Sequence, residues 1–346
     1  IDLGPEAGEQ GGELMSEGLP EDVLSDHNSL TARFLGPQEQ ESATHRDQVL
    51  AEAKLEALPR VEIKGARQNN LRGIDVEFPV GSMVAVTGVS GSGKSTLIDN
   101  VLHATYKRER GVVDVEPGDC DELAGVDALE DIVLVDQRPL GRSSRSNPVT
   151  YIKAYDELRK LYAAQPVAQR DHISPGHFSF NTDKGRCPEC EGRGTQEIDM
   201  HFMAAVQVVC EACEGRRFKD SVLAVRYQGL DIHQALELTV ERAKQFFSER
   251  RPLVRKLDAL SRVGLGYLRL GQSTATLSGG EAQRLKLASF LGTRKAEKPR
   301  LFLFDEPTTG LHLSDIDQLY RAFYQLVERG DGVLFIEHNL DPVSYT

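Results

Sequence analysis

The sequence predicts an α/β fold with a largely parallel sheet, and three observations predict it. Short apolar runs typical of buried strands alternate with stretches of helical periodicity. One such run leads into a glycine-rich loop, GVSGSGKST at 88–96, and another, LFLF at 301–304, ends in Asp305 and Glu306. Four cysteines in two C-x-x-C pairs lie between these segments. We therefore expect one α/β domain interrupted by a cysteine-bearing insert.

Composition places the chain among globular proteins. Of its 346 residues, 40% are hydrophobic and 27% are charged, which excludes a disordered chain. The net charge is −12, so any nucleic-acid surface would have to be local. No apolar run reaches the about 18 residues of a membrane span, and no signal peptide is visible. The paired cysteines indicate a reducing compartment, so we expect a cytoplasmic protein with no membrane partner.

The two ends of the chain differ from its middle. Ile1 is not an initiator methionine and the chain stops at Thr346, soon after a predicted strand, so we expect a fragment. Residues 1–36 are rich in glycine and acidic residues, with a short helical pattern near 20–30. Residues 37–60 have the polar composition of a linker.

Regular structure is expected from Val61 onward. Ile74, Val76 and Phe78 alternate with polar residues, which is the pattern of a strand with one buried face. Short continuous apolar runs predict buried strands at 301–304 and 333–336. A further short apolar run at 83–87 leads into the glycine loop, and 131–135 is another strand candidate. Helical periodicity predicts helices at 96–106, 151–163 and 232–247.

The glycine loop fits the pattern G-x4-G-K-[ST]. Its glycines let backbone N–H groups converge on phosphate oxygens. Lys94 would place its ammonium against the β- and γ-phosphates of ATP, and Ser95 would offer its hydroxyl to Mg²⁺. A chance match is the alternative, which the preceding strand and the following helix disfavour. The expected ATP-binding residues of the loop are Gly88, Ser90, Gly91, Gly93, Lys94, Ser95 and Thr96.

Two carboxylates follow the predicted strand at 301–304. Asp305 could hold Mg²⁺ directly or through water, and Glu306 could polarise the water that attacks the phosphate. Taken alone, the pair could be an ordinary acidic turn after a strand. The glycine loop in the same chain favours the catalytic interpretation.

A third motif, LSGGEAQRLKLA, begins at Leu277. Ser278 can cap the helix that follows, and Glu281 completes a capping box. Gly279 and Gly280 leave backbone N–H groups bare at the start of this helix, which makes a second anion site. A capped helix alone is ordinary structure. Together with the other motifs, however, this segment closely resembles the signature sequence of the ATP-binding-cassette family.

The cassette resemblance implies further roles. Gln137 matches the glutamine that senses Mg²⁺ and water, and His338 matches the histidine that contacts the γ-phosphate. In this family two cassettes pair head to tail, and the loop of one and the signature of the other hold one ATP. The resemblance thus implies that Lys94 and Ser278 serve different nucleotides, and that the chain needs a second cassette, from the same polypeptide or a homodimer.

The paired cysteines predict a structural zinc site. The two C-x-x-C pairs are separated by 19 residues, which is typical of four thiolates around a tetrahedral Zn²⁺. Disulfides and a redox or iron–sulfur site are weaker alternatives. The knuckles also resemble those of DnaJ-type chaperones, so a peptide-binding zinc module is a rival interpretation. The expected ligands are Cys187, Cys190, Cys210 and Cys213, with glycines at 192, 194 and 215 permitting turns whose N–H groups donate to sulfur.

Charge around the cysteines is balanced. Six acidic residues offset six basic ones, so composition does not by itself show DNA binding. The basic residues are Lys184, Arg186, Arg193, Arg216, Arg217 and Lys219.

The motifs together resemble the UvrA family, the damage-recognising ATPases of bacterial nucleotide-excision repair. The matching stretches are spread over residues 61–342 and include GARQNNLRGIDVEFPVG, VDQRPLGRSSRSNP, FSFN ahead of GRCPEC, MHF, and DEPTTGLH. The resemblance implies an ATP-binding-cassette domain with an inserted helical signature domain that carries the zinc module. The implied domains are the tail of a preceding cassette at 1–36, a linker at 37–60, the cassette core at 61–165 and 266–346, and the signature domain at 166–265 with its zinc module at 187–213.

The resemblance also implies a function. ATP, Mg²⁺ and Zn²⁺ would serve a protein that recognises damage in double-stranded DNA and loads a UvrB-like protein. Pro175, Gly176 and His177 stand where the family is usually more basic. A paralogue in resistance to DNA-binding drugs therefore stays open, as does a cassette ATPase with a non-DNA partner.

Overall fold

A computed structural model describes residues 2–4, 13–16, 57–140, 145–200, 203–293 and 296–337. The chain divides into two compact units, residues 1–138 with 293–346 (unit 1) and residues 139–292 (unit 2), and each is described by itself. Near the N-terminus β1 (Asp2–Gly4) pairs with β2 (Glu13–Ser16). The predicted helix near 20–30 and most of the 37–60 linker lie outside the described residues. Within the described ranges, no helix is long and apolar enough to span a membrane.

Unit 1 contains the predicted parallel sheet, in the order β5-β13-β12-β7. All three strand pairings are parallel. All five residues of β13 and the four central residues of β12 are buried, whereas β5 is half-buried along its length. The α/β prediction is confirmed. The strands are β5 (Met83–Val86), β7 (Asp131–Val135), β12 (Arg300–Asp305) and β13 (Gly332–Ile336).

A second, antiparallel sheet in unit 1 has the order β4-β3-β6. It comprises β3 (Arg60–Ala66), β4 (Ile74–Pro79) and β6 (Glu122–Ala124). The predicted alternating strand is β4, whereas the sequence did not predict β6. This sheet contributes Val61, Ile63 and Phe78 to a hydrophobic core. The same core contains Ile98 and Leu102, which lie on the helix that follows the glycine loop.

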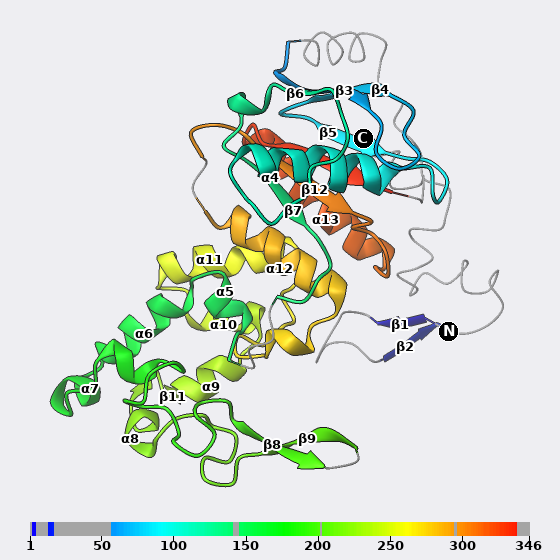
Figure 1. Ribbon diagram of the computed structural model, residues 1–346. Helices are drawn as coiled ribbons and strands as arrows, with labels where there is room; N and C mark the ends of the chain where they lie inside the picture. Colours follow the sequence, from blue (N-terminus) through cyan, green and yellow to red (C-terminus); the bar gives the residue numbers. More distant parts are fainter. Residues whose placement is uncertain are drawn as a thin grey trace. The chain divides into compact units, whose positions relative to one another are not determined.

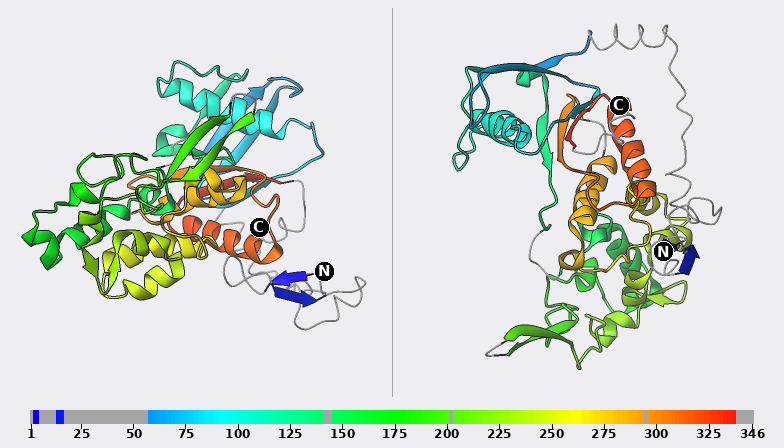
Figure 2. Two further views of the ribbon diagram at one scale, coloured as in Figure 1. Left: turned by 90° about the horizontal axis from the view of Figure 1, so that it is seen from below. Right: turned by 90° about the vertical axis from the view of Figure 1, so that its right-hand side faces the viewer.

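Helices cover both faces of the parallel sheet. The helix predicted at 96–106 is present as η2 (Thr96–Ala104), which winds as a π-helix and continues as α4 (Thr105–Glu109). It lies on one face, and α13 (Leu313–Glu328) lies on the other (Figures 1 and 2). Both faces of β12 and β13 are thus withdrawn from water, which explains why these two strands are continuously apolar rather than alternating. A short 3₁₀ turn, η3 (Val126–Ala128), leads toward β7.

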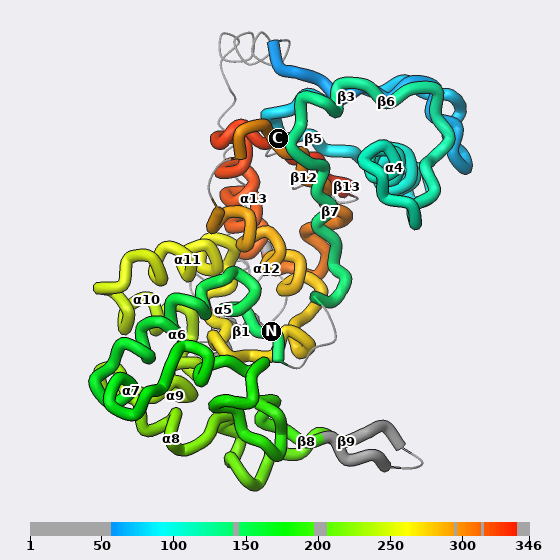
Figure 3. The backbone as a smooth tube through the Cα atoms, turned by 60° about the vertical axis from the view of Figure 1, so that its left-hand side comes forward, coloured from blue at the N-terminus to red at the C-terminus, as the bar shows by residue number. Residues whose placement is uncertain are grey.

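Unit 2 is mainly helical, and within it α6, α10 and α11 pack side by side (Figure 3). It also contains two antiparallel hairpins, β8 (Thr195–Met200) with β9 (Met203–Val209) and β10 (Arg226–Tyr227) with β11 (Leu230–Asp231). The helices are α5 (Pro148–Tyr151), α6 (Tyr155–Ala163), α7 (Pro166–Arg170), η4 (Pro175–Phe178), α8 (Asp220–Leu223), α9 (Ile232–Glu237), α10 (Val240–Phe246), α11 (Arg251–Arg262), η5 (Thr274–Thr276) and α12 (Gly279–Leu291).

Two helices that the sequence predicts as continuous are each broken in two. The helix predicted at 151–163 is interrupted at Lys153, whose φ of +56° is left-handed and cannot continue a right-handed helix. The helix predicted at 232–247 is interrupted at Leu238, which is extended, and Thr239 then caps α10. Apolar periodicity continues across both breaks, so periodicity alone did not reveal them.

Candidate functional site

The predicted phosphate- and metal-binding segments of unit 1 meet at one edge of the parallel sheet. The glycine loop follows β5, Gln137 comes two residues after β7, and Glu306 directly follows β12. Because these strands are parallel, their carboxyl ends lie at one edge, which is where such sheets bind ligands. The Gln137 side-chain N–H donates to the backbone oxygen of Glu306 over 3.1 Å. The structure thus brings the predicted glutamine and glutamate together.

The glycine loop has the backbone that its sequence requires. Gly88, Gly91 and Gly93 all have positive φ, a region that glycine adopts readily. Lys94 is buried, and its ammonium donates to the backbone oxygens of Gly88 and Val89 over 2.8 and 2.9 Å. The ammonium is therefore held against the loop, where phosphate oxygens could take the place of these acceptors.

Two asparagines that sequence reasoning missed fasten this loop from outside. The Asn70 side-chain N–H donates to the Gly91 backbone oxygen over 2.9 Å, and that of Asn69 donates to the Thr96 hydroxyl over 3.3 Å. A side chain at Gly93 would approach the Asn70 oxygen to 3.0 Å. In the sequence these residues are visible only as the NN pair in GARQNNLRG, and no neighbouring residue indicates that they contact the glycine loop.

Glu306 has a strained backbone at the place predicted for catalysis. Its φ is +43°, in the left-handed region that non-glycine residues seldom adopt, and such strain clusters at functional sites. Its N–H donates to the Ile336 backbone oxygen over 3.0 Å, and its carboxylate accepts from the Thr309 hydroxyl over 3.2 Å. The carboxylate is thus fixed at the edge of the sheet.

A buried glutamate fixes the turn after Glu306. Glu337 is 2% exposed, and one carboxylate oxygen accepts from both the N–H and the hydroxyl of Thr308, over 3.0 and 2.7 Å. Thr308 stands inside the motif DEPTTGLH and Glu337 directly precedes the predicted His338, but neither residue was assigned a role from the sequence. His338, the next residue, lies outside the described residues.

The signature motif belongs to unit 2, whereas Lys94, Gln137 and Glu306 belong to unit 1. The predicted capping box is confirmed: the Ser278 hydroxyl accepts from the Glu281 N–H over 3.3 Å, and the Ser278 N–H donates to the Glu281 carboxylate over 2.7 Å. Gly279 and Gly280 are accordingly the first two residues of α12.

Asp99 is a titratable residue near the nucleotide site that the sequence did not reveal. It lies on η2, directly after the glycine loop. Burial and, to a smaller extent, the negative charge of Asp305 together raise the pKa of Asp99 to about 6, although Arg138 opposes the shift. Ionisation of Asp99 therefore costs more free energy in the folded protein than in the unfolded chain.

This shift predicts a pH-dependent stability. The folded pKa of Asp99 lies above its ordinary 3.8, so stability is highest at low pH and is lost as pH rises through about 6. At pH 8, without added Mg²⁺ or nucleotide, Asp99→Asn should raise the free energy of unfolding by roughly 1 kcal/mol, a value reduced for solvent screening. The increase in unfolding free energy caused by Asp99→Asn should be smaller at pH 5. Denaturant-induced unfolding of both proteins at the two pH values would check this. An equal gain at both pH values would contradict the assignment.

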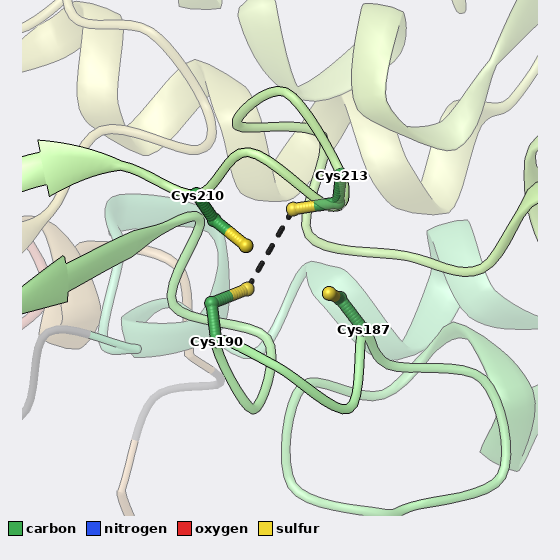
Figure 4. A group of neighbouring side chains, drawn as sticks. All are labelled: Cys187, Cys190, Cys210 and Cys213. Carbon is green, nitrogen blue, oxygen red and sulfur yellow. Dashed lines mark hydrogen bonds between the residues drawn. The ribbon is translucent and has the colours of Figure 1, made fainter.

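The four predicted cysteines converge in unit 2, with their sulfurs pointing toward one another (Figure 4). All four are buried, none is in a disulfide, and their sulfurs lie within 4.8 Å of one another. Tetrahedral zinc with Zn–S bonds of about 2.3 Å would place sulfurs about 3.8 Å apart. Cys190 and Cys213 have their sulfurs 3.6 Å apart. The cluster therefore fits a four-thiolate metal site.

The glycines after the cysteines act as the sequence predicts. Gly192, Gly194 and Gly215 have positive φ, and the Gly194 N–H donates to the Cys190 sulfur over 3.3 Å. The Gly194 backbone oxygen in turn accepts from the Cys210 N–H over 3.0 Å, which ties the two knuckles together.

The protonation chemistry of the cluster also fits a cation. At Cys210 burial is outweighed by hydrogen bonds from the Cys213 backbone and side chain, which lower its pKa. Burial, by contrast, raises the pKa of the Cys213 thiol to about 12 and likewise raises the pKa of the Cys190 thiol. Such thiols do not ionise at neutral pH without a compensating positive charge. A divalent metal supplies that charge and accepts thiolate ligands.

Comparison with known proteins agrees with this fold. The chain is 45% identical to UvrABC system protein A of Staphylococcus aureus (strain COL) over 344 residues, which are 99% of this chain and 36% of that protein. It is 43% identical to UvrABC system protein A of Staphylococcus epidermidis over the same shares. The crystal structure of UvrA2 from Deinococcus radiodurans matches with a TM-score of 0.87 and 40% identity, covering 99% of this chain and 40% of that one.

No protein-family model matches the sequence. The chain spans little more than a third of the length of the curated relatives that it matches, 36% in each of the two cases. The match nevertheless includes the glycine loop, the four cysteines and the signature helix, because it extends over 99% of the chain. Over nearly its entire length, this chain belongs to the UvrA family.

Proposed function

We propose that this chain is the ATP-hydrolysing, zinc-bearing part of a cytoplasmic UvrA-type DNA-repair ATPase. One observation carries the proposal: Gln137 and Glu306 lie in hydrogen-bond contact at the sheet edge that also bears the glycine loop. This arrangement occurs in a chain that is 45% identical to UvrABC system protein A. The geometry supports ATP hydrolysis, and the family relationship supports DNA as the partner.

In this proposal each residue of unit 1 has a defined task. Lys94 and the N–H groups of the glycine loop bind the phosphates, while Ser95 and Asp305 hold Mg²⁺, which neutralises phosphate charge when bound. Glu306 orients and polarises the attacking water, and its strained, hydrogen-bonded backbone keeps it in place. Gln137 would report the state of the Mg²⁺ site to the start of unit 2, two residues further on.

A second cassette completes the site in this proposal. The N-terminus of α12, with Ser278, Gly279 and Gly280, closes over the γ-phosphate of a nucleotide held by another cassette. His338 contacts the γ-phosphate of the nucleotide bound in its own cassette. The second cassette comes from the same polypeptide or from a homodimer.

We further propose that ATP turnover drives recognition of damaged double-stranded DNA and loading of a UvrB-like protein, with Zn²⁺ on the four cysteines stiffening the insert. A paralogue that acts against DNA-binding drugs is the second candidate. One feature favours it: the segment before Phe178 presents a capped turn, in which the Ser174 N–H donates to the His177 ring over 3.1 Å, rather than a run of basic side chains.

The test is steady-state ATP hydrolysis by this chain and by the longer protein that contains it. Each is assayed alone, with undamaged duplex and with duplex carrying a bulky adduct. Turnover that changes with DNA, together with DNA affinity that falls steeply with salt, is the expected result. Turnover that ignores DNA, with binding no tighter than that of an unrelated protein of equal net charge, would favour a non-DNA partner. A response to a drug–DNA complex alone would favour the paralogue.

A further inference from the structure

Tyr267 holds the glutamate of the signature capping box from outside the helix. Its hydroxyl donates to one carboxylate oxygen of Glu281 over 2.5 Å, while the other oxygen accepts from the Ser278 N–H over 2.7 Å. Both carboxylate oxygens of Glu281 are therefore engaged. Hydrogen bonds to a carboxylate are shorter and stronger than those between neutral groups, so Tyr267 ties the first turn of α12 firmly to another segment of unit 2.

The segment that carries Tyr267 is itself fixed by backbone hydrogen bonds. Residues 266–271 lie beside residues 236–241, where the helix predicted at 232–247 is broken. The break leaves backbone groups that a continuous helix would bond internally, and residues 266–271 bond to them instead. The N–H groups of Val240, Glu241, Leu270 and Gly271 pair with the backbone oxygens of Leu268, Gly266, Leu238 and Leu236, over 2.9, 3.1, 3.0 and 2.7 Å respectively.

Packing on both sides of Tyr267 restricts this segment further. Leu265 and Leu268 are fully buried. Glycine allows the close approach to residues 236–241: a side-chain carbon at Gly266 would lie 2.8 Å from a Glu241 carboxylate oxygen, and one at Gly271 would lie 2.9 Å from the Leu236 Cβ atom. Tyr267 therefore projects from a segment with little freedom to move.

A fixed direction matters at the start of α12. The bonds between Ser278 and Glu281 lie within the first turn and move with it, whereas the bond from Tyr267 refers that turn to the rest of unit 2. Donor groups that already point at a developing charge stabilise it without reorganising during the reaction. The bond from Tyr267 supplies such an arrangement to the N–H groups of Gly279 and Gly280.

We infer that Tyr267 is a positioning residue for ATP hydrolysis, which holds the N-terminus of α12 in place through Glu281. This inference rests on the proposed function, in which that N-terminus closes over a γ-phosphate. Tyr267 itself needs no contact with the nucleotide. Loss of its hydroxyl should lower kcat more than it weakens ATP binding, because Lys94 and the glycine loop still hold the phosphates and only the closed arrangement is less favourable.

The experiment uses the longer protein that contains this chain and measures steady-state ATP hydrolysis. Tyr267→Phe removes one hydroxyl and should lower kcat about 10-fold, the worth of one hydrogen bond to a charged group. The KM for ATP should stay within about threefold of the original. Tyr162→Phe is the matched control in unit 2, because it removes a hydroxyl that donates to the backbone oxygens of Leu230 and Asp231 over 3.1 Å. Its kcat should not change.

A double-mutant cycle tests whether Tyr267 acts through Glu281. Glu281→Ala removes the acceptor, so adding Tyr267→Phe to it should lower kcat no further. Losses that multiply would overturn the inference, as would full turnover in Tyr267→Phe or Glu281→Ala, or an equal loss in Tyr162→Phe. Far-ultraviolet circular dichroism checks that each assayed variant is folded. An unmodified protein that does not hydrolyse ATP would refute the proposed function itself, which is a distinct result.

Discussion

Replacement of Glu306 with glutamine is expected to lower the rate of ATP turnover by about 100- to 10,000-fold, the range for loss of a positioned catalytic base. Glutamine has the same length and can still accept the hydrogen bond that the Thr309 hydroxyl gives over 3.2 Å. The change therefore removes the negative charge that polarises water and leaves the strained turn in place. Phosphate release measured over many turnovers checks the rate.

ATP binding should survive this change, because Lys94 and the glycine loop hold the phosphates without Glu306. The dissociation constant of a fluorescent ATP analogue should stay within about threefold of the original, well under one kcal/mol. Glu328→Gln is the matched control: the same substitution at an exposed position at the end of α13 should change neither quantity. Full turnover in Glu306→Gln would place the catalytic base elsewhere.

The features predicted correctly from the sequence depend on short-range patterns. Continuous apolar runs identify the strands that are buried on both faces, and the three-residue spacing from Ser278 to Glu281 specifies a capping box that the structure contains. The spacing within each cysteine pair likewise indicates that both cysteines bind the same metal ion. In each case neighbouring residues carry the whole signal.

The features that sequence reasoning missed depend on contacts between distant segments. Thr308 and Glu337 meet only because β12 and β13 are adjacent parallel strands. The pKa of Asp99 depends on its burial and on Asp305, which follows more than 200 residues later in the sequence. The break at Lys153 arises from the left-handed backbone of this residue. The apolar periodicity of the sequence does not reveal the break, because the helices on both sides of it bury side chains in the same unit.

Substitution of Cys213 with serine is expected to abolish stable zinc binding. A structural zinc site contributes roughly 10–16 kcal/mol of apparent binding free energy, and a neutral hydroxyl replaces one of four thiolate ligands poorly. Zinc content after dialysis, measured by mass spectrometry, should fall from about one ion per chain to near zero. Cys120→Ser is the control, because Cys120 lies outside the cluster in unit 1.

Loss of zinc should also lower hydrogen-exchange protection at the residues that contact the two knuckles. The Cys187 and Cys210 N–H groups, which bond to the opposite knuckle, should exchange with deuterium at least 100-fold faster, since each tenfold change corresponds to about 1.4 kcal/mol of lost protection. Phe218 packs on Phe180, whose ring stacks on Tyr155 at 5.0 Å, so protection should also fall at the start of α6. Slow exchange and retained zinc in Cys213→Ser would contradict the four-cysteine site. Fast exchange confined to the knuckles would instead show that the aromatic stack holds α6 without the metal.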